Sequence, residues 1–384
     1  MAFDRQLSDK VSRNEAQAIL TIDLGALVAN WRLIAARVAP ARCAAVVKAD
    51  AYGIGIEAAV PALAAAGCTV FFVAHPSEGR RVRACLASRP NIEIYVLNGL
   101  LPGPDYLATY LAYDLRPVLG SLAEFDLWMQ SAPPGAPQPA IHVDTGMNRL
   151  GLAPSEALAL AARMATGEAA CKAALLISHF AASEAIDDPL NGRQIALFDK
   201  LRPAFPGVAA SFANSSAIFL PQRPYFDLVR PGYALYGGNP TPGAVNPMRP
   251  VLKLAAPIIQ LRDIPAGATV GYNGQWTALR PTRLAVIGLG YADGLPRNAM
   301  ATNARPGGEA MVCGRRCRFA GRISMDLTII DVTDVPAKDL APGVMAELLS
   351  PEITIDDLAA RAGTIGYEIL TNLGRRYHRI YIGG

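Results

Sequence analysis

The sequence lacks a strong excess of charge of either sign, and it lacks a stretch suited to a membrane. Its 36 basic residues nearly balance 32 acidic residues, so the formal net charge is +4. The basic residues are scattered, whereas nucleic-acid-binding proteins gather them in a patch or stripe. The uncharged run 58–74 is shorter than the ~20 residues of a membrane-spanning helix, and it contains Pro61 and Gly67. We therefore expect neither a nucleic-acid partner nor a membrane segment.

We also expect no secretory signal, no disulfide framework and no metal site. The chain begins Met-Ala-Phe-Asp-Arg-Gln, without the apolar core of a signal peptide. Cys313 and Cys317 have no second pair and no nearby histidine, so their spacing does not predict zinc binding. Free thiols in a reducing cytoplasm are the expectation for all six dispersed cysteines, Cys43, Cys68, Cys85, Cys171, Cys313 and Cys317.

The sequence is instead rich in apolar residues arranged in a repeating pattern. A hydrophobic share of 52% against 18% charged residues in 384 positions indicates a globular protein of more than one domain. From about residue 44 to 237, short apolar runs alternate with amphipathic stretches. The apolar runs predict eight strands, at Ala44–Ala49, Thr69–Ala74, Ile92–Asn98, Leu115–Leu119, Ala140–Thr145, Ala174–Phe180, Ala209–Ser215 and Phe226–Tyr233.

The stretches between these strands predict helices, several of them opened by a capping serine or asparagine. Continuous apolar strands that alternate with helices predict a parallel sheet of the α/β class. Eight such repeats in roughly 200 residues predict a closed (β/α)8 TIM barrel. An open doubly wound sheet is the alternative, although no Gly-x-Gly-x-x-Gly follows the first strand. The helices are expected at Ser77–Ser88, Ser121–Ala132, Ser155–Thr166 and Asn191–Leu201.

The pattern changes near residues 247–250, and we place a domain boundary between residues 248 and 249. Residues 249–384 predict a mostly β C-terminal domain with one helix, Ile355–Ala362. Residues 1–248 hold the barrel, but a strand expected at Ala18–Ile22, within residues 1–25, is a candidate to pair with the second domain. The later strands are expected at Leu252–Leu261, Leu284–Leu289, Glu309–Val312 and Leu327–Val332.

Polar residues stand where the barrel strands end, which is where such barrels carry their functional groups. Lys48 ends the first strand, Asp144-Thr-Gly-Met-Asn-Arg149 follows the fifth, and His179 ends the sixth. Each has a structural alternative. A lone lysine often extends its amine to water, and a lone histidine is often a hydrogen-bonded core residue or a helix cap. They indicate a functional site only if the fold brings them together at one end of the barrel.

The last two strands add groups that suit a phosphate, which such barrels bind in the loops after strands seven and eight. Asn214-Ser215-Ser216 follows the seventh strand, and the eighth ends Arg230-Pro-Gly232-Tyr233. Alone, these are an N-cap and a turn. Together with the amine of Lys48, they suit a phosphate-bearing aldehyde that is held to the lysine as a Schiff base.

The stretch Val-Val-Lys48-Ala-Asp-Ala-Tyr52-Gly resembles the cofactor-lysine signature of alanine racemases, which use pyridoxal 5′-phosphate. The resemblance covers residues from about 18 to 380, and nine pieces in one order make it specific. It implies a barrel followed by a β domain, a cytoplasmic homodimer, and interconversion of L- and D-alanine by two-base proton transfer on an aldimine. The other pieces are Asp144-Thr-Gly-Met-Asn-Arg149, Ser-His179-Phe, Ala-Asn214-Ser215, Val-Arg230-Pro-Gly232, Val-Gly-Tyr272-Asn, Gly-Tyr291-Ala-Asp-Gly, Gly-Arg322-Ile-Ser-Met325-Asp and Gly-Tyr367-Glu.

The resemblance assigns the cofactor contacts. Lys48 would form the Schiff base, and Arg230 would face the pyridine nitrogen with His179 beside it. Because a guanidinium cannot give up its proton, the ring would stay neutral and be a weaker electron sink. The phosphate would lie near Tyr52, Asn214, Ser215, Gly232, Tyr233 and Tyr367.

The resemblance also assigns two bases on opposite faces of the substrate. Lys48 would serve one face, and Tyr272 of a partner subunit would serve the other. Arg149 and the backbone at Met325 would receive the carboxylate of a small amino acid. Tyr291 would narrow the entrance.

Three positions depart from the family pattern. His142 replaces a lysine that many members carry as a carbamate beside the arginine, so we expect another group, such as a bound chloride, to hold Arg149. Gly53-Ile54-Gly55 replaces Gly-His-Gly, and Ser324 replaces a cysteine. These departures leave fine specificity open.

Several functional alternatives remain. A broader racemase that also accepts serine fits the same residues, and D-alanine could supply peptidoglycan precursors or be degraded. A barrel-type amino-acid decarboxylase is expected to pair an acidic residue, not Arg230, with the ring nitrogen. A non-catalytic protein that carries pyridoxal phosphate on a single barrel would lack the region after residue 250.

Overall fold

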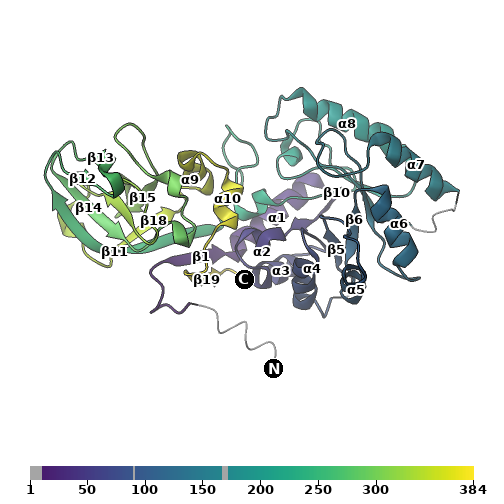
Figure 1. Ribbon diagram of the computed structural model, residues 1–384, viewed down its shortest axis with the longest axis horizontal. Helices are drawn as coiled ribbons and strands as arrows, with labels where there is room; N and C mark the ends of the chain where they lie inside the picture. Colours follow the sequence, from purple (N-terminus) through teal and green to yellow (C-terminus); the bar gives the residue numbers. More distant parts are fainter. Residues whose placement is uncertain (1–10, 90, 167–171) are drawn as a thin grey trace. The chain divides into compact units, whose positions relative to one another are not determined.

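The structure is a computed structural model that describes residues 11–89, 91–166 and 172–384 (Figure 1). The described residues form two compact units. The barrel unit contains residues 27–235 and 239–248, and the C-terminal unit contains the described residues up to Ala26, residues 236–238 and residues 249–384. Cys171 lies outside the described residues. None of the described helices is both long and apolar enough to span a bilayer.

The barrel unit is a ring of parallel strands closed by one split strand. Strands β2 (Arg42–Cys43) and β3 (Ala45–Val46) are consecutive, and they lie at opposite ends of the strand order. β2 pairs with β10 (Leu228–Val229), and β3 pairs with β4 (Val70–Val73). Between them the Ala44 amide donates to the Val229 carbonyl at 3.0 Å, so the ring closes. The predicted (β/α)8 barrel is confirmed.

The strands and helices of the ring alternate along the chain. All four residues of β4 are buried, as expected for a parallel strand that is covered on both faces. The remaining elements are α1 (Leu24–Val38), α2 (Lys48–Tyr52), α3 (Ile56–Ala65), α4 (Pro76–Cys85), β5 (Glu93–Val96), α5 (Pro104–Ala112), β6 (Arg116–Leu119), α6 (Leu122–Ser131), β7 (Ala140–His142), α7 (Pro154–Ala165), β8 (Leu175–Ile177), α8 (Pro189–Leu201) and β9 (Ala209–Ser211).

The predicted helix starts were right in one case and wrong in three. Ser121 caps α6, because its hydroxyl accepts from the Glu124 amide at 3.1 Å. The other three helices begin earlier than predicted, at Pro76, Pro154 and Pro189. Proline suits the first helical position, because its fixed φ is helical and its missing N–H has no partner to lose there.

All eight predicted barrel strands extend beyond the strands observed, and the first and the eighth show two reasons. The first does not reach Ala49, because the chain leaves the strand at Val46 and turns into α2. The eighth shrinks from Phe226–Tyr233 to the two residues of β10. The residues after Val229 remain buried without pairing as strand, so burial alone extended the prediction too far.

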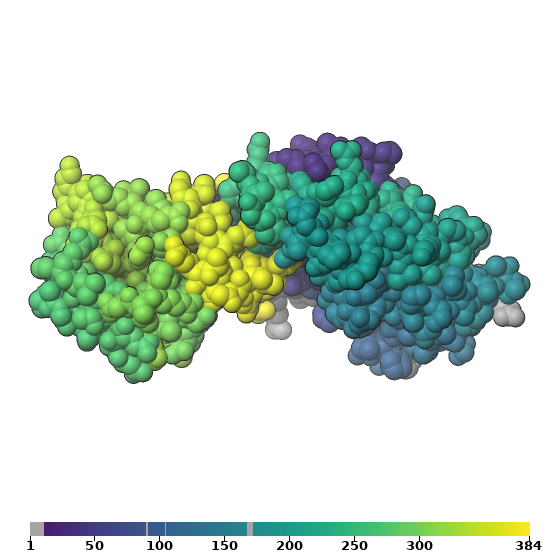
Figure 2. All heavy atoms as spheres, turned by 90° about the horizontal axis from the view of Figure 1, so that it is seen from above, coloured from purple at the N-terminus to yellow at the C-terminus, as the bar shows by residue number. Residues whose placement is uncertain are grey.

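The C-terminal unit is built on an eight-stranded sheet. β1 (Ile19–Asp23) pairs antiparallel with β11 (Leu252–Ile264) and parallel with β19 (His378–Ile382). In Figure 2 the last residues, in yellow, lie beside the light green atoms of this unit. The other strands of this sheet are β14 (Thr282–Ile287), β15 (Glu309–Val312), β16 (Arg315–Arg318), β17 (Thr328–Asp331) and β18 (Met345–Leu349). A separate two-stranded sheet is formed by β12 (Thr269–Val270) and β13 (Trp276–Thr277).

Two helices accompany these strands. α9 (Ile355–Ala362) has the predicted bounds, and a capping box fixes its start. In that box the Thr354 hydroxyl accepts from the Asp357 amide at 3.1 Å, and Asp357 Oδ2 accepts from the Thr354 amide at 2.9 Å. α10 (Gly366–Thr371) was not predicted. The mostly β architecture of this unit is confirmed.

Candidate active site

A left-handed turn follows the first barrel strand and carries Lys48 at its start. The four residues after Lys48 have φ between 51° and 56°. Each non-glycine residue in this region costs about 1–2 kcal/mol, so surrounding contacts must hold the turn. The turn places Lys48 at the carboxyl end of β3 and buries Tyr52, which is 6% exposed.

Arg230 is a buried cation at the end of β10. Its Nη1 donates to Ser211 Oγ at 2.7 Å, and its Nη2 donates to the Ser178 carbonyl at 2.6 Å. Nη2 also lies 3.4 Å from His179 Nδ1, and the guanidinium carbon lies 5.8 Å from the centre of the Phe72 ring. Burial lowers the pKa of Arg230 to about 10, which leaves it cationic at neutral pH. The structure therefore places Arg230 and His179 together, as predicted.

Hydroxyl groups and bare backbone meet in the loops after β9 and β10. Ser215 Oγ accepts from the Gly232 amide at 3.0 Å and from the Ala234 amide at 3.2 Å. A Cβ placed on Gly232 would lie 2.3 Å from Tyr52 Oη. Tyr233 is 4% exposed. The phenol, the hydroxyl and the glycine backbone thus form a small polar cradle, here named the 232 cradle, which fits a phosphate group.

Asn214 directly precedes Ser215 of the 232 cradle, and its side-chain oxygen holds the local loop together. Its Oδ1 accepts from the Ser183 hydroxyl and from the Ala217 amide, both at 2.9 Å. The second contact reaches the first residue of a short 3₁₀ helix, Ala217–Phe219, whose N-cap residue is Ser216 and makes no side-chain capping bond. These two contacts of the amide oxygen are structural.

The barrel mouth is strongly cationic. Burial, and then Arg149, lower the pKa of Lys48, while Glu78 raises it. Burial and then Arg230 lower the pKa of His142 to about 4 and that of His179 well below its usual value. Both histidines are therefore neutral at pH 7, because burial and then the neighbouring arginines disfavour their charged forms. Such a cluster suits an anionic ligand, such as a phosphate or a carboxylate.

Arg149 is presented by a loop that one carboxylate organises. Asp144 accepts from the amides of Gly146 (2.9 Å), Met147 (2.8 Å) and Asn148 (2.9 Å). The loop returns to the strand, where the Leu152 amide donates to the His142 carbonyl at 2.8 Å. Arg149 is exposed, and within the described chain it has no hydrogen-bond or salt-bridge partner. The anion expected beside Arg149 stays a prediction.

His142 is expected to make the protein sensitive to mild acid. Its folded pKa of about 4 lies below the roughly 6.5 of an unfolded histidine, so its contribution to stability is present above pH 6.5 and is lost toward pH 4. The loss is about 2 kcal/mol at pH 5. Urea unfolding at pH 7 and at pH 5 measures this loss of unfolding free energy. The loss should be smaller in His142→Asn than in wild type. Replacing the exposed His75 with asparagine is the control, and equal losses in both variants would contradict the prediction.

The remaining predicted residues lie in the C-terminal unit. Tyr272 is 66% exposed in a hairpin loop between β12 and β13. The amides of Tyr291 and Ala292 donate to the carbonyls of Ser324 (3.1 Å) and Met325 (2.9 Å), which brings Tyr291 and Met325 together. Arg322 Nε donates to Gln275 Oε1 at 3.0 Å and ties this segment to the hairpin of Tyr272.

Tyr367 also belongs to the C-terminal unit, where it is half-buried on α10. The predicted residues thus fall into two groups. The barrel unit holds Lys48, Tyr52, Arg149, His179, Asn214, Ser215, Arg230, Gly232 and Tyr233, and the C-terminal unit holds Tyr272, Tyr291, Met325 and Tyr367.

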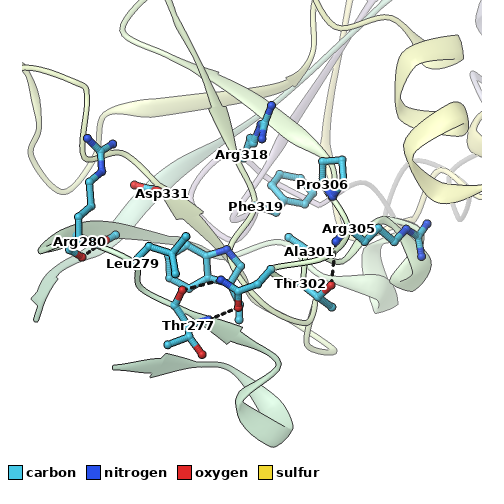
Figure 3. Close-up of a pocket in the computed structure, with 14 residues that line it drawn as sticks. Thr277, Leu279, Arg280, Ala301, Thr302, Arg305, Pro306, Arg318, Phe319 and Asp331 are labelled. Carbon is cyan, nitrogen blue, oxygen red and sulfur yellow. Dashed lines mark hydrogen bonds between the residues drawn. The ribbon is translucent and has the colours of Figure 1, made fainter. Parts of the chain in front are cut away.

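A cavity of about 570 Å³ in the C-terminal unit is separate from these residues (Figure 3). Trp276, Phe319 and Arg318 line it, and no lysine, histidine or tyrosine is among its lining residues. Asn303 exchanges two hydrogen bonds with the backbone of Thr277, at 2.7 and 2.8 Å. These bonds stiffen β13 and thereby the hairpin that carries Tyr272. We assign the cavity a structural role.

Sequence reasoning missed the residues that hold the predicted ones in place. Glu78 binds the backbone next to Lys48, Asp144 shapes the loop of Arg149, and Ser211 holds Arg230. For Glu78 a usable signal existed, because His75-Pro-Ser-Glu78 places a glutamate at the third helical position. For Ser211 the sequence offered no such signal.

The two halves of the chain match two domains of one family. Residues 22–240 match the alanine racemase N-terminal domain, and residues 251–381 match the alanine racemase C-terminal domain. An alanine racemase of Methylobacterium sp. (strain 4-46) is 55% identical over 367 residues, covering 95% of this chain and 98% of the relative. An alanine racemase of Acidiphilium cryptum (strain JF-5) is 51% identical over 363 residues, covering 94% and 98%.

Solved structures are similar over the same length. An alanine racemase from Bartonella henselae, with covalently bound pyridoxal phosphate, has a TM-score of 0.87 and 39% identity, and the match covers 96% of this chain and 100% of that one. The biosynthetic alanine racemase from Pseudomonas aeruginosa has a TM-score of 0.87 and 32% identity, with 95% and 99% covered. The chain therefore belongs to the alanine racemase family.

Proposed function

We propose that the protein is a pyridoxal-phosphate-dependent racemase that interconverts L-alanine and D-alanine. One observation carries the proposal: a lysine amine, a buried arginine with neutral partners and the 232 cradle meet at one barrel mouth. The alanine racemase from Bartonella henselae, which is 39% identical, holds covalently bound pyridoxal phosphate and supports this choice of cofactor.

The residues of the barrel mouth fit the cofactor. Tyr52 and Ser215 offer hydroxyl groups at the 232 cradle, where the missing side chain of Gly232 leaves the backbone bare. Pyridoxal phosphate supplies, when bound, an aldehyde that condenses with amines and a ring that withdraws electrons from Cα. Lys48 would hold the aldehyde carbon, and Tyr233, Tyr367 and Asn214 would border the phosphate.

Arg230 would direct the reaction toward racemisation. A guanidinium keeps its proton, so it can donate a hydrogen bond to the ring nitrogen but cannot protonate it. The hydrogen bonds from Arg230 to Ser211 and Ser178 hold the guanidinium rigid, and neutral His179 beside it adds no second charge. An acidic partner at this position, as expected in a decarboxylase, is replaced here by a fixed cation.

Two bases would move the Cα proton. Lys48 Nζ would take or return it on one face of the substrate, because the lowered pKa of this amine favours its neutral form. Tyr272 Oη would act on the other face. Arg149 would bind the substrate carboxylate together with the backbone at Met325, and Tyr291 would exclude larger side chains.

We place Tyr272, Met325 and Tyr291 of one subunit at the active site of another, in a homodimer. Large side chains on the C-terminal unit support this, because Tyr272, Met325 and Ile365 are 66%, 53% and 59% exposed. Exposed apolar groups of this size commonly mark contact surfaces. The cytoplasm is the proposed compartment, since the described cysteines are free thiols.

Gly232→Ala is expected to weaken binding of pyridoxal phosphate by about tenfold or more, because the new Cβ would displace the buried phenol of Tyr52. Absorbance titration of the cofactor-free chain with pyridoxal phosphate measures the Kd. Gly192→Ala is the matched control, since a Cβ on that glycine would meet nothing within 4 Å. Equal Kd values for the two variants would argue against the phosphate placement.

Incubation of each alanine enantiomer with the protein in deuterated water tests the function. We expect the optical rotation of each solution to fall to zero and deuterium to appear at Cα of both enantiomers. No carbon dioxide should be released. Serine, run in parallel, shows whether the specificity is narrow. Release of carbon dioxide would support a decarboxylase, and binding of pyridoxal phosphate without Cα exchange would support a non-catalytic carrier.

A further inference from the structure

Helix α4 holds the left-handed turn of Lys48 through two side chains, and Figure 1 shows α2 and α4 as neighbours. Glu78 Oε1 accepts from the Ala49 amide at 2.6 Å. Three positions further along the same helix, Arg81 Nη2 donates to Asp50 Oδ1 at 2.5 Å. The two residues that follow Lys48 are therefore each tied to α4. These ties offset the cost of four successive non-glycine residues in the left-handed region.

The carboxylate of Glu78 joins two separate barrel segments. Its Oε2 accepts from the amides of Ala74 and His75, at 2.8 and 3.2 Å, at the end of β4. Its Oε1 accepts from Ala49 in the turn after β3. All three partners are donors, so both oxygens must accept, which an ionised carboxylate does and a carboxamide does not.

Helix α7 shows that capping alone does not explain this arrangement. The order Pro154-Ser-Glu156 repeats Pro76-Ser-Glu78 at the same helical positions. Glu156 Oε2 accepts from the Ala153 amide at 2.8 Å, and within the described residues its side chain makes no other hydrogen bond. Both glutamates cap their own helix, but Glu78 also reaches the segment that carries Lys48.

Glu78 also carries a charge opposite in sign to the two arginines that act on Lys48. Arg149 in the loop after β7, Arg230 after β10 and neutral His179 after β8 interact electrostatically with Lys48. Burial is the largest cause that lowers the pKa of Lys48, the two arginines lower it further, and Glu78 raises it. Glu78 therefore acts on both the backbone and the charge of this lysine.

We propose that Glu78 is a positioning residue for Lys48. Its carboxylate fixes the amide next to the lysine in the left-handed turn, and its negative charge opposes the effect of Arg149 and Arg230 on the lysine amine. The consequence for catalysis rests on the proposed function, but the effect on the amine belongs to the chain itself and is measurable without turnover.

The test compares Glu78→Gln with two matched variants, Arg81→Gln and Glu156→Gln, in the full chain freed of cofactor. Acetylation of Lys48 is followed by peptide mass spectrometry across pH, and amide exchange is followed at Ala49. We expect Glu78→Gln to move the midpoint of the labelling profile to lower pH and to speed exchange at Ala49 about tenfold or more. Arg81→Gln should speed this exchange with the midpoint unmoved, and Glu156→Gln should change neither readout.

Reloaded with pyridoxal phosphate, Glu78→Gln should lower kcat about tenfold or more and leave KM within about threefold, since Arg149 is untouched. If the carboxamide prevents folding, Glu78→Asp replaces it: the charge remains but the reach shortens. That variant should keep the midpoint and still speed exchange at Ala49.

An unmoved midpoint in Glu78→Gln, with a kcat loss no larger than that of Arg81→Gln, would overturn the proposal and leave Glu78 a helix cap. A wild-type protein that shows the labelling effect but no racemisation would instead overturn the proposed function and leave the role of Glu78 intact.

Discussion

Lys48→Ala is expected to lower kcat/KM for racemisation of both enantiomers by about 10⁴-fold or more. Two losses combine, because the same amine would hold the cofactor and would act as one of the two bases. The turn itself should persist, because Glu78 and Arg81 bind the two residues after Lys48 and make no contact that needs the lysine side chain. Polarimetry or a coupled D-alanine assay measures the rates, and reduction with borohydride followed by mass spectrometry checks covalent attachment of the cofactor.

Two controls separate this prediction from a general loss of structure. Lys200→Ala removes an exposed amine at the end of α8 and should leave the rate unchanged. Added methylamine should restore part of the activity of Lys48→Ala, because a small amine can enter the space that the side chain leaves. A Lys48→Ala protein that retains a tenth of the wild-type rate would refute the assignment.

The barrel could be predicted because its strands are apolar throughout and its helices are amphipathic. Parallel strands covered on both faces leave this pattern in any sequence, as the four buried residues of β4 show. The left-handed turn could not be predicted. Alanine and tyrosine have no preference for positive φ, and the run Ala44–Ala49 reads as a continuous strand, so the contacts of α4 decide the conformation.

The candidate site likewise contains residues that the sequence predicts and supporting residues that it does not. Lys48, His179 and Arg230 were predictable, because the ends of barrel strands are known places for functional groups and the family motifs coincide with them. Their supports were not, because each is contributed by another element. Ser211 lies on β9 and Glu78 on α4, and no local pattern links either to its partner.

Tyr272→Phe is expected to lower racemisation in both directions by about 10³-fold, because each turnover needs one base on each face. Exchange of the Cα proton with solvent should persist for one enantiomer only. Lys48 can still remove and return a proton on its own face, so one enantiomer should gain deuterium at Cα without inversion. Proton NMR in deuterated water measures this. Tyr106→Phe, on an exposed tyrosine of α5, is the control, and inversion at the wild-type rate in Tyr272→Phe would exclude the phenol as a base.

Mixing two inactive variants tests whether Tyr272 acts on the partner subunit. In a symmetric dimer with shared sites, a Lys48→Ala subunit paired with a Tyr272→Phe subunit forms one site with both wild-type bases and one site with neither. Random exchange of equal amounts makes half of the dimers mixed, so activity should recover to about one quarter of the wild-type value. If Lys48 and Tyr272 of the same chain worked together, no pairing of these variants would contain an intact site. Recovery therefore requires that the phenol crosses to the other subunit, and its absence after proven subunit exchange would place both bases in one chain.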